Sequence, residues 1–330
     1  MKKKLIFSGI RATGRLHLGN YLGAVKGMLD LQAKRDYKMI FAVVDVHAIT
    51  TPYNKETLAK KTREVILDYL ACGLDPAKST LLVQSKVADL HCELAFYFSC
   101  LASIARMKHL PTFKEKVKLH PQSATMALLN YPLLMAADIL AYKSELVPVG
   151  IDQEPHLEVA REIARKMNKI YGLHFPEPKR FATRGEYIPS LLGEGKMSKS
   201  VKNSYINLTD DLKTIKKRLA KTPTDIGQGK KVPPKGGVAS LLKLVELFQG
   251  KEKREVYEKE YLAKGIKYQE VKENLAEAIY TELKPIQKKR KELKRYPDYV
   301  DQAIEKGALE ARKIAKRTLE EVKTKMGFIS

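Results

Sequence analysis

Short apolar runs alternate with longer amphipathic stretches over the first two hundred residues. Three runs rich in Ile, Val, Leu and Phe predict central strands, at residues 4–7, 39–44 and 80–83. Three stretches between and after these runs have the helical spacing of apolar positions, at residues 21–31, 55–71 and 89–105. Strands that alternate with helices are typical of a parallel sheet covered by helices, so the pattern predicts a doubly wound α/β domain.

The stretch 89–105 is apolar nearly all round, with Cys92, Phe96 and Cys100 four residues apart. Such a helix is either fully buried or a subunit interface. The third cysteine is Cys72, and the three form no C-x-x-C pair. Their odd number and spacing argue against a disulfide framework and a structural zinc. We therefore expect all three cysteines to be small buried hydrophobic residues.

The pattern changes near residue 203, where β-branched runs stop and Lys-rich helical periodicity continues to the end. Thr209 predicts a helix N-cap, with two aspartates in the first turn, and Thr222-Pro223 ends that helix. After a Gly/Pro/Lys-rich loop at 225–237, further helices are expected to start near 238, 251, 267 and 297. We predict an α/β domain at 1–203 and an all-α domain at 204–330, and leave open a return to the first domain near the C-terminus.

The charge adds a partner to this picture. The 330 residues include 61 Lys and Arg against 38 Asp and Glu, a net charge of +23, which indicates a polyanion as partner. More than half of the excess lies after residue 200, and residues 284–295 contain seven basic side chains and one acidic. A solvated helix face is the alternative interpretation of that run. With 44% apolar residues, disorder is excluded for most of the chain.

Neither a leader nor a membrane span is expected. The apolar run after the N-terminal lysines, residues 5–7, is too short for a secretory signal. The most apolar stretch, 126–142, is interrupted by Asn130, Pro132 and Asp138. The sequence therefore predicts a soluble, cytoplasmic protein.

Residues 8–20 follow the first strand directly and open the first helix. Gly9, Gly14 and Gly19 allow close approach of the backbone to a ligand, and the helix start offers unpaired N–H groups to an anion. A doubly wound sheet binds nucleotides at this place. His17 and Asn20 can donate to a phosphate. A Gly-containing turn capped by Asn20 is the structural alternative.

Residues 196–200, Lys-Met-Ser-Lys-Ser, follow a Gly-Glu-Gly segment. Lys196 and Lys199 are three residues apart and can close over a triphosphate and neutralise a departing pyrophosphate. An ordinary Lys-rich surface loop is the alternative.

Tyr131, Met135 and Asp138 share one face if residues 126–142 are helical. Asp138 lies among apolar residues, where a carboxylate without a donor costs several kcal/mol. A backbone cap or a pair with Lys143 could satisfy it, and so could a ligand.

His17-Leu18-Gly19-Asn20 together with residues 196–200 resembles the two signatures of the class I aminoacyl-tRNA synthetases. Within that class the chain is similar to the tryptophanyl-tRNA synthetases at residues 44–50, 131–140, 147–153 and 168–172. The resemblance is specific from Phe7 to Ser200 and looser through the helical part, including 283–287. Arg11-Ala12 and Ile151 depart from it, because the family often has Gln-Pro or Arg-Pro and an acid there.

The resemblance implies three groups of site residues. Catalysis is implied for His17, Asn20, Lys196 and Lys199. ATP binding is implied for Arg11, Ala12, Thr13, Gly19, Asn20, Gly150, Ile151, Asp152, Ile188, Lys196, Met197, Ser198, Lys199 and Ser200. Tryptophan binding is implied for Phe7, His47, Tyr131, Met135, Asp138 and Gln153.

Within the tryptophan group, the resemblance implies that Asp138 accepts the indole N–H while Phe7 and Met135 contact the ring. Tyr131 and Gln153 match the groups that hold the ammonium. His47 has an alternative role as a strand-end histidine bonded to Thr50 or Thr51. The remaining histidines have no metal spacing and receive no role: His91, His109, His120, His156 and His174.

The implied fold is a Rossmann-like class I catalytic domain followed by a basic, helical tRNA anticodon-binding domain. The implied activity forms tryptophanyl-adenylate and pyrophosphate from L-tryptophan and ATP, then transfers tryptophan to the terminal ribose of tRNA(Trp). ATP with Mg²⁺, no protein-bound metal, and a homodimer with 89–105 as interface candidate are also implied.

Three other functions stay open at this point. A tyrosyl-specific enzyme of the same fold would need a hydroxyl-recognising pair in place of Met135 and Asp138. A small-molecule nucleotidylyltransferase could use a similar turn after the first strand, but it would not need a strongly basic helical domain. A non-catalytic RNA-binding module would not depend on Lys199.

Overall fold

A five-stranded parallel sheet organises the structure, a computed structural model that describes residues 3–34, 36–119, 121–182, 187–199 and 201–329. The strands are β1 (Lys4–Arg11), β2 (Tyr37–Val44), β3 (Ser79–Val83), β4 (Leu146–Pro148) and β5 (Lys179–Phe181). Their order is β3-β2-β1-β4-β5, which places the switch point of a doubly wound sheet between β1 and β4. The predicted fold class and three predicted strands are confirmed, and β4 and β5 were not predicted.

The chain divides into two compact units, both discontinuous in sequence. Unit 1 contains residues 1–14, 27–183 and 296–330, and unit 2 contains residues 15–26 and 184–295. The sheet belongs to unit 1, and the chain returns to that unit at its C-terminal end. The functional division at residue 203 stays a prediction.

Helices of unit 1 cover a sheet in which β2 and β3 are the most buried strands, as expected for a parallel sheet. Six consecutive residues of β2, 39–44, are buried. The unit's longer helices are α3 (Lys55–Cys72), α4 (Ala88–Ser99), α6 (Pro111–Leu119), α7 (Met126–Leu140), α8 (Glu154–Tyr171) and α13 (Pro297–Met326). Shorter turns are α5 (Ile104–Lys108), η2 (Val46–Thr50), η3 (Gln84–Val87), η4 (Pro121–Ser123) and η5 (Ile151–Gln153).

The helix predicted at 89–105 is two helices, because Ser103 caps α5 by accepting a hydrogen bond from the Arg106 N–H. α4 packs against α7 and α13 but leaves Phe96 68% exposed. Cys92 and Cys100 are exposed as well, and Cys72 is half-buried. The prediction of three buried cysteines is therefore wrong. A helix that is apolar all round does not reveal which of its sides the fold covers.

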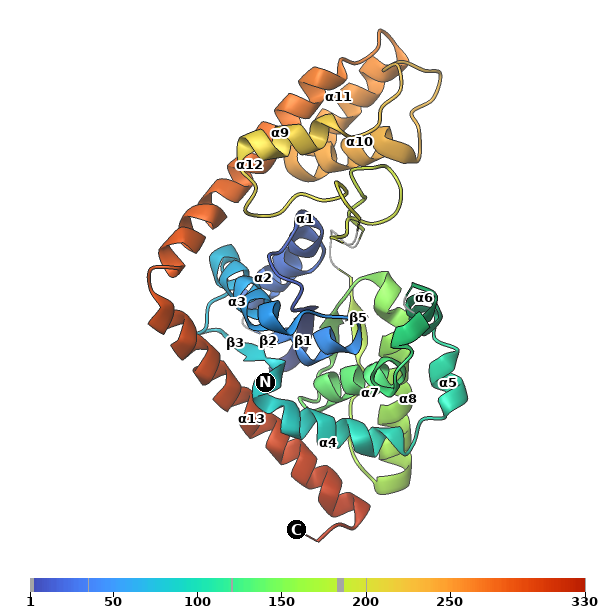
Figure 1. Ribbon diagram of the computed structural model, residues 1–330, viewed down its shortest axis with the longest axis vertical. Helices are drawn as coiled ribbons and strands as arrows, with labels where there is room; N and C mark the ends of the chain where they lie inside the picture. Colours follow the sequence, from blue (N-terminus) through green and yellow to red (C-terminus); the bar gives the residue numbers. More distant parts are fainter. Residues whose placement is uncertain (1–2, 35, 120, 183–186, 200, 330) are drawn as a thin grey trace. The chain divides into compact units, whose positions relative to one another are not determined.

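α13 lies along β3 and α4 (Figure 1). A Cβ atom on Gly307 would lie 1.8 Å from the carbonyl oxygen of Leu81, so the helix backbone rests against the backbone of edge strand β3. Thr80 donates to Glu310 at 2.9 Å. Ion pairs continue along the helix and join Arg63 to Asp301, Lys86 to Glu305, Arg312 to Asp89 and Lys143 to Glu321.

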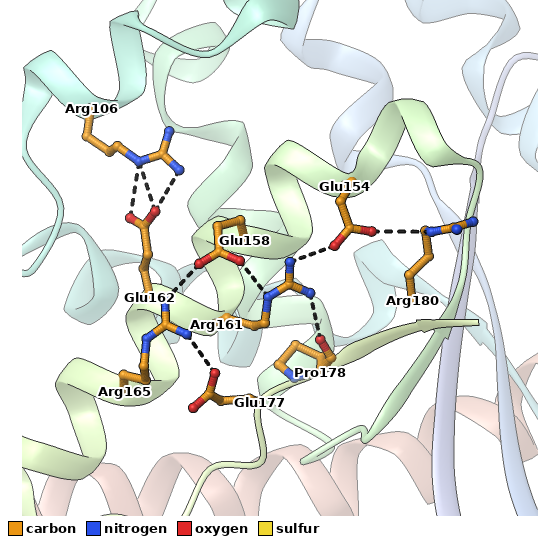
Figure 2. Close-up of polar contacts among 9 residues, drawn as sticks. All are labelled: Arg106, Glu154, Glu158, Arg161, Glu162, Arg165, Glu177, Pro178 and Arg180. Carbon is orange, nitrogen blue, oxygen red and sulfur yellow. Dashed lines mark hydrogen bonds and ion pairs between the residues drawn. The ribbon is translucent and has the colours of Figure 1, made fainter. Parts of the chain in front are cut away.

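A chain of ion pairs fixes α8 to its neighbours, as Figure 2 shows. Arg161 contacts Glu154 and Glu158 at 2.6 Å and donates to the Pro178 carbonyl at 3.1 Å. The remaining pairs are Arg106 with Glu162, Arg165 with Glu158 and Glu177, and Arg180 with Glu154. These contacts hold α8 in place, and α8 begins directly after residues 150–153, which are among the predicted site residues.

Unit 2 is mainly helical. Its helices are α1 (Leu18–Asn20), the π-turn η1 (Tyr21–Val25), α9 (Leu212–Ala220), α10 (Gly236–Gln249), α11 (Lys251–Leu262) and α12 (Tyr268–Leu293). α2 (Lys26–Gln32) continues from η1, so the helix predicted at 21–31 begins with a π-turn. Asp211 rather than Thr209 caps α9, because its carboxylate accepts from the Thr214 N–H. In the ranges described above, no helix is long and apolar enough to cross a membrane.

Candidate functional site

The two predicted signatures meet in unit 2. Backbone hydrogen bonds join Leu18 to Ile206 at 2.9 Å and the Met197 N–H to the Ile188 carbonyl, also at 2.9 Å. A Cβ atom on Gly19 would lie 2.8 Å from His17 Cε1 and 3.3 Å from the Met197 Cβ. A side chain at position 19 would therefore force the His17 ring, and to a smaller degree Met197, to move.

His17 is a neutral imidazole beside two lysines. Burial lowers its pKa, the charges of Lys199 and Lys196 lower it further, and the result is about 4. Among the described residues, nothing hydrogen-bonds its buried Nδ1 atom. A buried imidazole nitrogen close to two positive charges suits an anionic ligand, which would give that nitrogen a partner.

The other predicted residues of unit 2 have their own contacts. Asn20 Oδ1 accepts from the His17 N–H at 3.3 Å, so its side chain stabilises the helix start. Ile188 is 1% exposed and contributes its backbone. The Ser198 carbonyl accepts from the Ser204 hydroxyl at 2.5 Å. Ser200 lies outside the described residues.

Asp138 in unit 1 is a buried carboxylate, only 1% exposed, with several hydrogen-bond partners. Gln84 Nε2 lies 2.7 and 2.9 Å from its two oxygens, His91 Nδ1 lies 2.7 Å from Oδ1, and His47 Nε2 lies 2.9 Å from Oδ2. Burial opposes ionisation, but the hydrogen bonds from both histidines outweigh it and lower the pKa of Asp138 to about 2. The carboxylate is therefore ionised.

Two structural alternatives are settled by these contacts. Lys143 pairs with Glu321 at 2.7 Å, so the alternative pairing of Asp138 with Lys143 is wrong. Thr50 donates to the backbone carbonyl of His47, but the imidazole itself faces Asp138. Gln84 and His91 were missed from sequence, because they are 54 and 47 residues from Asp138 and only the topology brings them together.

Tyr131 belongs to a second buried group of polar side chains. Its hydroxyl lies 2.8 Å from Thr112 Oγ1 and 2.5 Å from His156 Nε2, and Thr112 Oγ1 lies 2.7 Å from the same nitrogen. Burial, then the charge of Lys116, lowers the pKa of His156 to about 4. The His156 Nδ1 atom has no hydrogen-bond partner in the described part of the chain. Neither Thr112 nor His156 was predicted.

Two desolvated cations accompany this group. Lys116 Nζ lies 4.2 Å from the centroid of the Tyr131 ring, and burial together with Arg11 lowers its pKa to about 8. Arg11 donates to the His47 carbonyl at 3.2 Å and to Thr51 Oγ1 at 3.0 Å. Burial lowers the pKa of Arg11. For Lys116 the loss of hydration and the charge of Arg11 outweigh the opposing charge of Glu115, and a cation in that position suits an anionic ligand.

The remaining predicted residues of unit 1 differ in their exposure. Phe7 is buried and its ring stacks on Tyr142 with centroids 5.7 Å apart, whereas Met135 is half-buried. Gln153 donates to Asp152 Oδ2 at 2.8 Å. Ala12 is buried, while Thr13, Ile151 and Asp152 are exposed and Gly150 is half-buried. Within the described ranges, no three His, Cys, Asp or Glu side chains come together as a metal site.

Comparisons with known proteins place this geometry in a family. Residues 2–284 match the family described as tRNA synthetases class I (W and Y). The chain is 41% identical to tryptophan–tRNA ligase of Wolinella succinogenes over 334 residues and covers 100% of both chains. It is 38% identical to the ligase of Porphyromonas gingivalis, covering 98% of this chain and 99% of that relative.

Solved structures agree. The tryptophanyl-tRNA synthetase of Mycoplasma pneumoniae superposes with a TM-score of 0.86 at 28% identity, covering 99% of each chain. That of Campylobacter jejuni, in complex with ADP and tryptophan, superposes with a TM-score of 0.82 at 31% identity, covering 98% of this chain and 100% of that one. The chain therefore belongs to the class I tRNA synthetases of the tryptophan and tyrosine family, and within it to the tryptophan–tRNA ligases.

Proposed function

We propose that this chain activates L-tryptophan with ATP and transfers it to tRNA(Trp). A tryptophan carboxylate oxygen attacks the α-phosphorus, the bond to the β-phosphate oxygen breaks, and pyrophosphate leaves. A hydroxyl of the terminal tRNA ribose then attacks the acyl carbon and AMP leaves. The contact between the two signatures at Gly19, in a chain similar to tryptophan–tRNA ligases over its full length, carries this proposal.

The catalytic roles proposed for unit 2 rest on charge and hydrogen bonding. His17 and Asn20 would donate to the phosphates, and Lys196 and Lys199 would neutralise the charge that develops on pyrophosphate. The lowered pKa of His17, caused by burial and by both lysines, supports an anion at this point. ATP would enter as its Mg²⁺ complex, bound by residues 196–200 together with Gly19 and Ile188.

The amino-acid site proposed for unit 1 is built around the Asp138 carboxylate. Asp138 would accept the indole N–H, with Phe7, His47 and Met135 lining the ring and Tyr131 and Gln153 holding the ammonium. An ionised carboxylate is a suitable acceptor, because it offers about four acceptor positions and no donor. Arg11, Ala12 and Thr13 of the turn after β1, with Gly150, Ile151 and Asp152, would bind the nucleotide.

Tryptophan is the largest standard side chain, so smaller amino acids must be rejected through lost contacts. A site built to hydrogen-bond a substrate N–H can discriminate against analogues that lack it by about 10⁴ to 10⁵. We further propose a homodimer and a cytoplasmic setting. The exposed apolar side of α4, formed by Cys92, Phe96 and Cys100, is the proposed subunit interface.

ATP–pyrophosphate exchange, measured with each of the twenty amino acids, tests the function. Tryptophan alone should support rapid exchange. Exchange with tyrosine and none with tryptophan would overturn the proposal in favour of a tyrosyl-specific enzyme. Exchange that persists undiminished in Lys199→Ala would contradict the proposed role of the second signature.

A further inference from the structure

Three donors from three different elements converge on Asp138. Gln84 comes from η3, His91 from α4 and His47 from η2, and all three side chains are buried. The tryptophan site proposed above gives a role to His47 and Asp138 but none to Gln84 and His91. Buried polar side chains that meet a functional carboxylate call for an explanation.

Gln84 is fixed at both ends of its amide. Its Oε1 accepts from the backbone N–H groups of Val46 and His47, at 3.1 and 3.2 Å. Its Nε2 spans the two oxygens of Asp138. The amide therefore cannot turn without losing hydrogen bonds at both ends, and it fixes the plane of the carboxylate.

His91 connects Asp138 to an aromatic pair. Because a carboxylate accepts only, His91 Nδ1 donates to it, and His91 Nε2 can then accept from the Tyr142 hydroxyl 2.8 Å away. Burial, with the Asp138 charge as a second cause, raises the pKa of Tyr142, so the hydroxyl keeps its proton. The Tyr142 ring in turn stacks on Phe7 with an interplanar angle of 10°.

We propose that Gln84, His91 and Tyr142 are positioning residues that set selectivity for the indole N–H by fixing the Asp138 carboxylate and the Phe7 ring relative to each other. This inference rests on the proposed function, because it gives Asp138 the indole as ligand. The three donors make four contacts with the two carboxylate oxygens, so the indole N–H would share an oxygen with one of them. A substrate without a donor at that place lacks this hydrogen bond, at a cost in binding.

The test compares tryptophan with β-(3-benzothienyl)alanine, in which sulfur replaces the indole N–H. The measured quantity is the ratio of the two kcat/KM values in ATP–pyrophosphate exchange. In Tyr142→Phe and His91→Gln the ratio should fall by about tenfold, since one hydrogen bond in a charged network is lost or displaced. The loss should appear in the KM for tryptophan, with the KM for ATP and the kcat/KM for the analogue nearly unchanged.

Tyr69→Phe is the matched control. Tyr69 is also fully buried in unit 1, but its hydroxyl donates to the Ala42 carbonyl and, within the described residues, not to Asp138 or its three donors. Its ratio should equal that of the unmodified chain. Equal losses for tryptophan and the analogue in Tyr142→Phe would overturn the inference, because a purely structural role affects both substrates.

The inference and the function fail in different ways. If the unmodified chain supports no tryptophan-dependent exchange, the proposed function is wrong. If that exchange is present and Asp138→Asn reduces the ratio, but Tyr142→Phe and His91→Gln leave it unchanged, the function stands and the positioning role is wrong. Since the chain contains no tryptophan of its own, fluorescence of the bound substrate gives an independent binding constant for each variant.

Discussion

Gly19 is packed against an imidazole and a side chain of the second signature. In Gly19→Ala the new methyl group would lie 2.8 Å from the His17 ring and 3.3 Å from Met197. The imidazole and Met197 must therefore both move away from the methyl group. We expect ATP–pyrophosphate exchange to fall by about 10² or more, because catalytic geometry is lost while the fold remains. Gly172→Ala controls for a general loss of stability, since a Cβ there meets no atom within 4 Å but the φ of +64° makes alanine strained. Normal exchange in Gly19→Ala would contradict the proposed contact.

His156 predicts a dependence of stability on pH. Its pKa is lowered to about 4 in the folded chain, below the ordinary 6.5 of an unfolded histidine. The unfolded state then binds more protons between these values, so the free energy of unfolding falls as the pH drops from 6.5 towards 4, by up to about 3 kcal/mol.

Urea unfolding of His156→Gln at about pH 7.5 and about pH 5 checks this expectation. The midpoint difference between the two pH values should be smaller than in the unmodified chain. It should not vanish, because burial lowers the pKa of His17 as well. An unchanged difference would rule out the buried neutral state of His156.

At the scale of single residues, the sequence predicts that a buried polar group needs a hydrogen-bond partner, but it does not predict which residue is that partner. The apolar surroundings of Asp138 require a donor, and that requirement follows from its neighbours along the chain alone. The identity of the donors does not, because Gln84 and His91 lie on segments that the crossover from β3 to β4 brings alongside α7. A histidine on a largely apolar helix such as α4 has the same local sequence whether it faces a carboxylate or the core.

At the scale of elements, α13 depends on a single glycine for its approach to the sheet. In Gly307→Ala a methyl group would lie 1.8 Å from the Leu81 carbonyl oxygen, so the helix must move away from β3. Overpacking of this kind costs about 1–3 kcal/mol, which chemical denaturation of the full chain would measure. Leu309→Ala, at a position that is 70% exposed on the same helix, should cost far less. Equal effects would contradict the packing of α13.

Elements with strong periodicity were predictable and very short ones were not. α10, α11, α12 and α13 begin within two residues of their predicted starts, because Gly and Pro mark the loops between amphipathic runs. β4 and β5 have three residues each, too few for a period to show. Their place in the sheet is set by pairing with β1 and with each other.

At the scale of the whole molecule, the surplus of +23 predicts salt-sensitive binding of tRNA(Trp). Lys288, Lys289 and Lys291 are exposed on α12, whereas Arg290 between them is buried. Replacing the three lysines by alanine should reduce the slope of log K against log salt by about 2–3 and leave pyrophosphate exchange unchanged. The control replaces Lys313, Lys316 and Arg317 of α13. Equal slopes in both triple variants would contradict tRNA binding by α12.

The proposed homodimer predicts a sensitivity at the exposed side of α4. Phe96→Asp places a charge at a position that is 68% exposed, and sedimentation at micromolar concentration should show a monomer in place of a dimer. Ile170→Asp, at another exposed apolar position of unit 1, should leave the dimer intact. A dimer that tolerates Phe96→Asp would place the interface elsewhere.

The covering of β3 by α13 also affects folding during synthesis. Thr80 and Glu310 are 230 positions apart. In a growing chain, the edge of β3 therefore stays uncovered until α13 has been synthesised. A fragment that ends before α13 contains Asp138 and its three donors but lacks the helix that covers β3. We expect such fragments to aggregate or to be degraded.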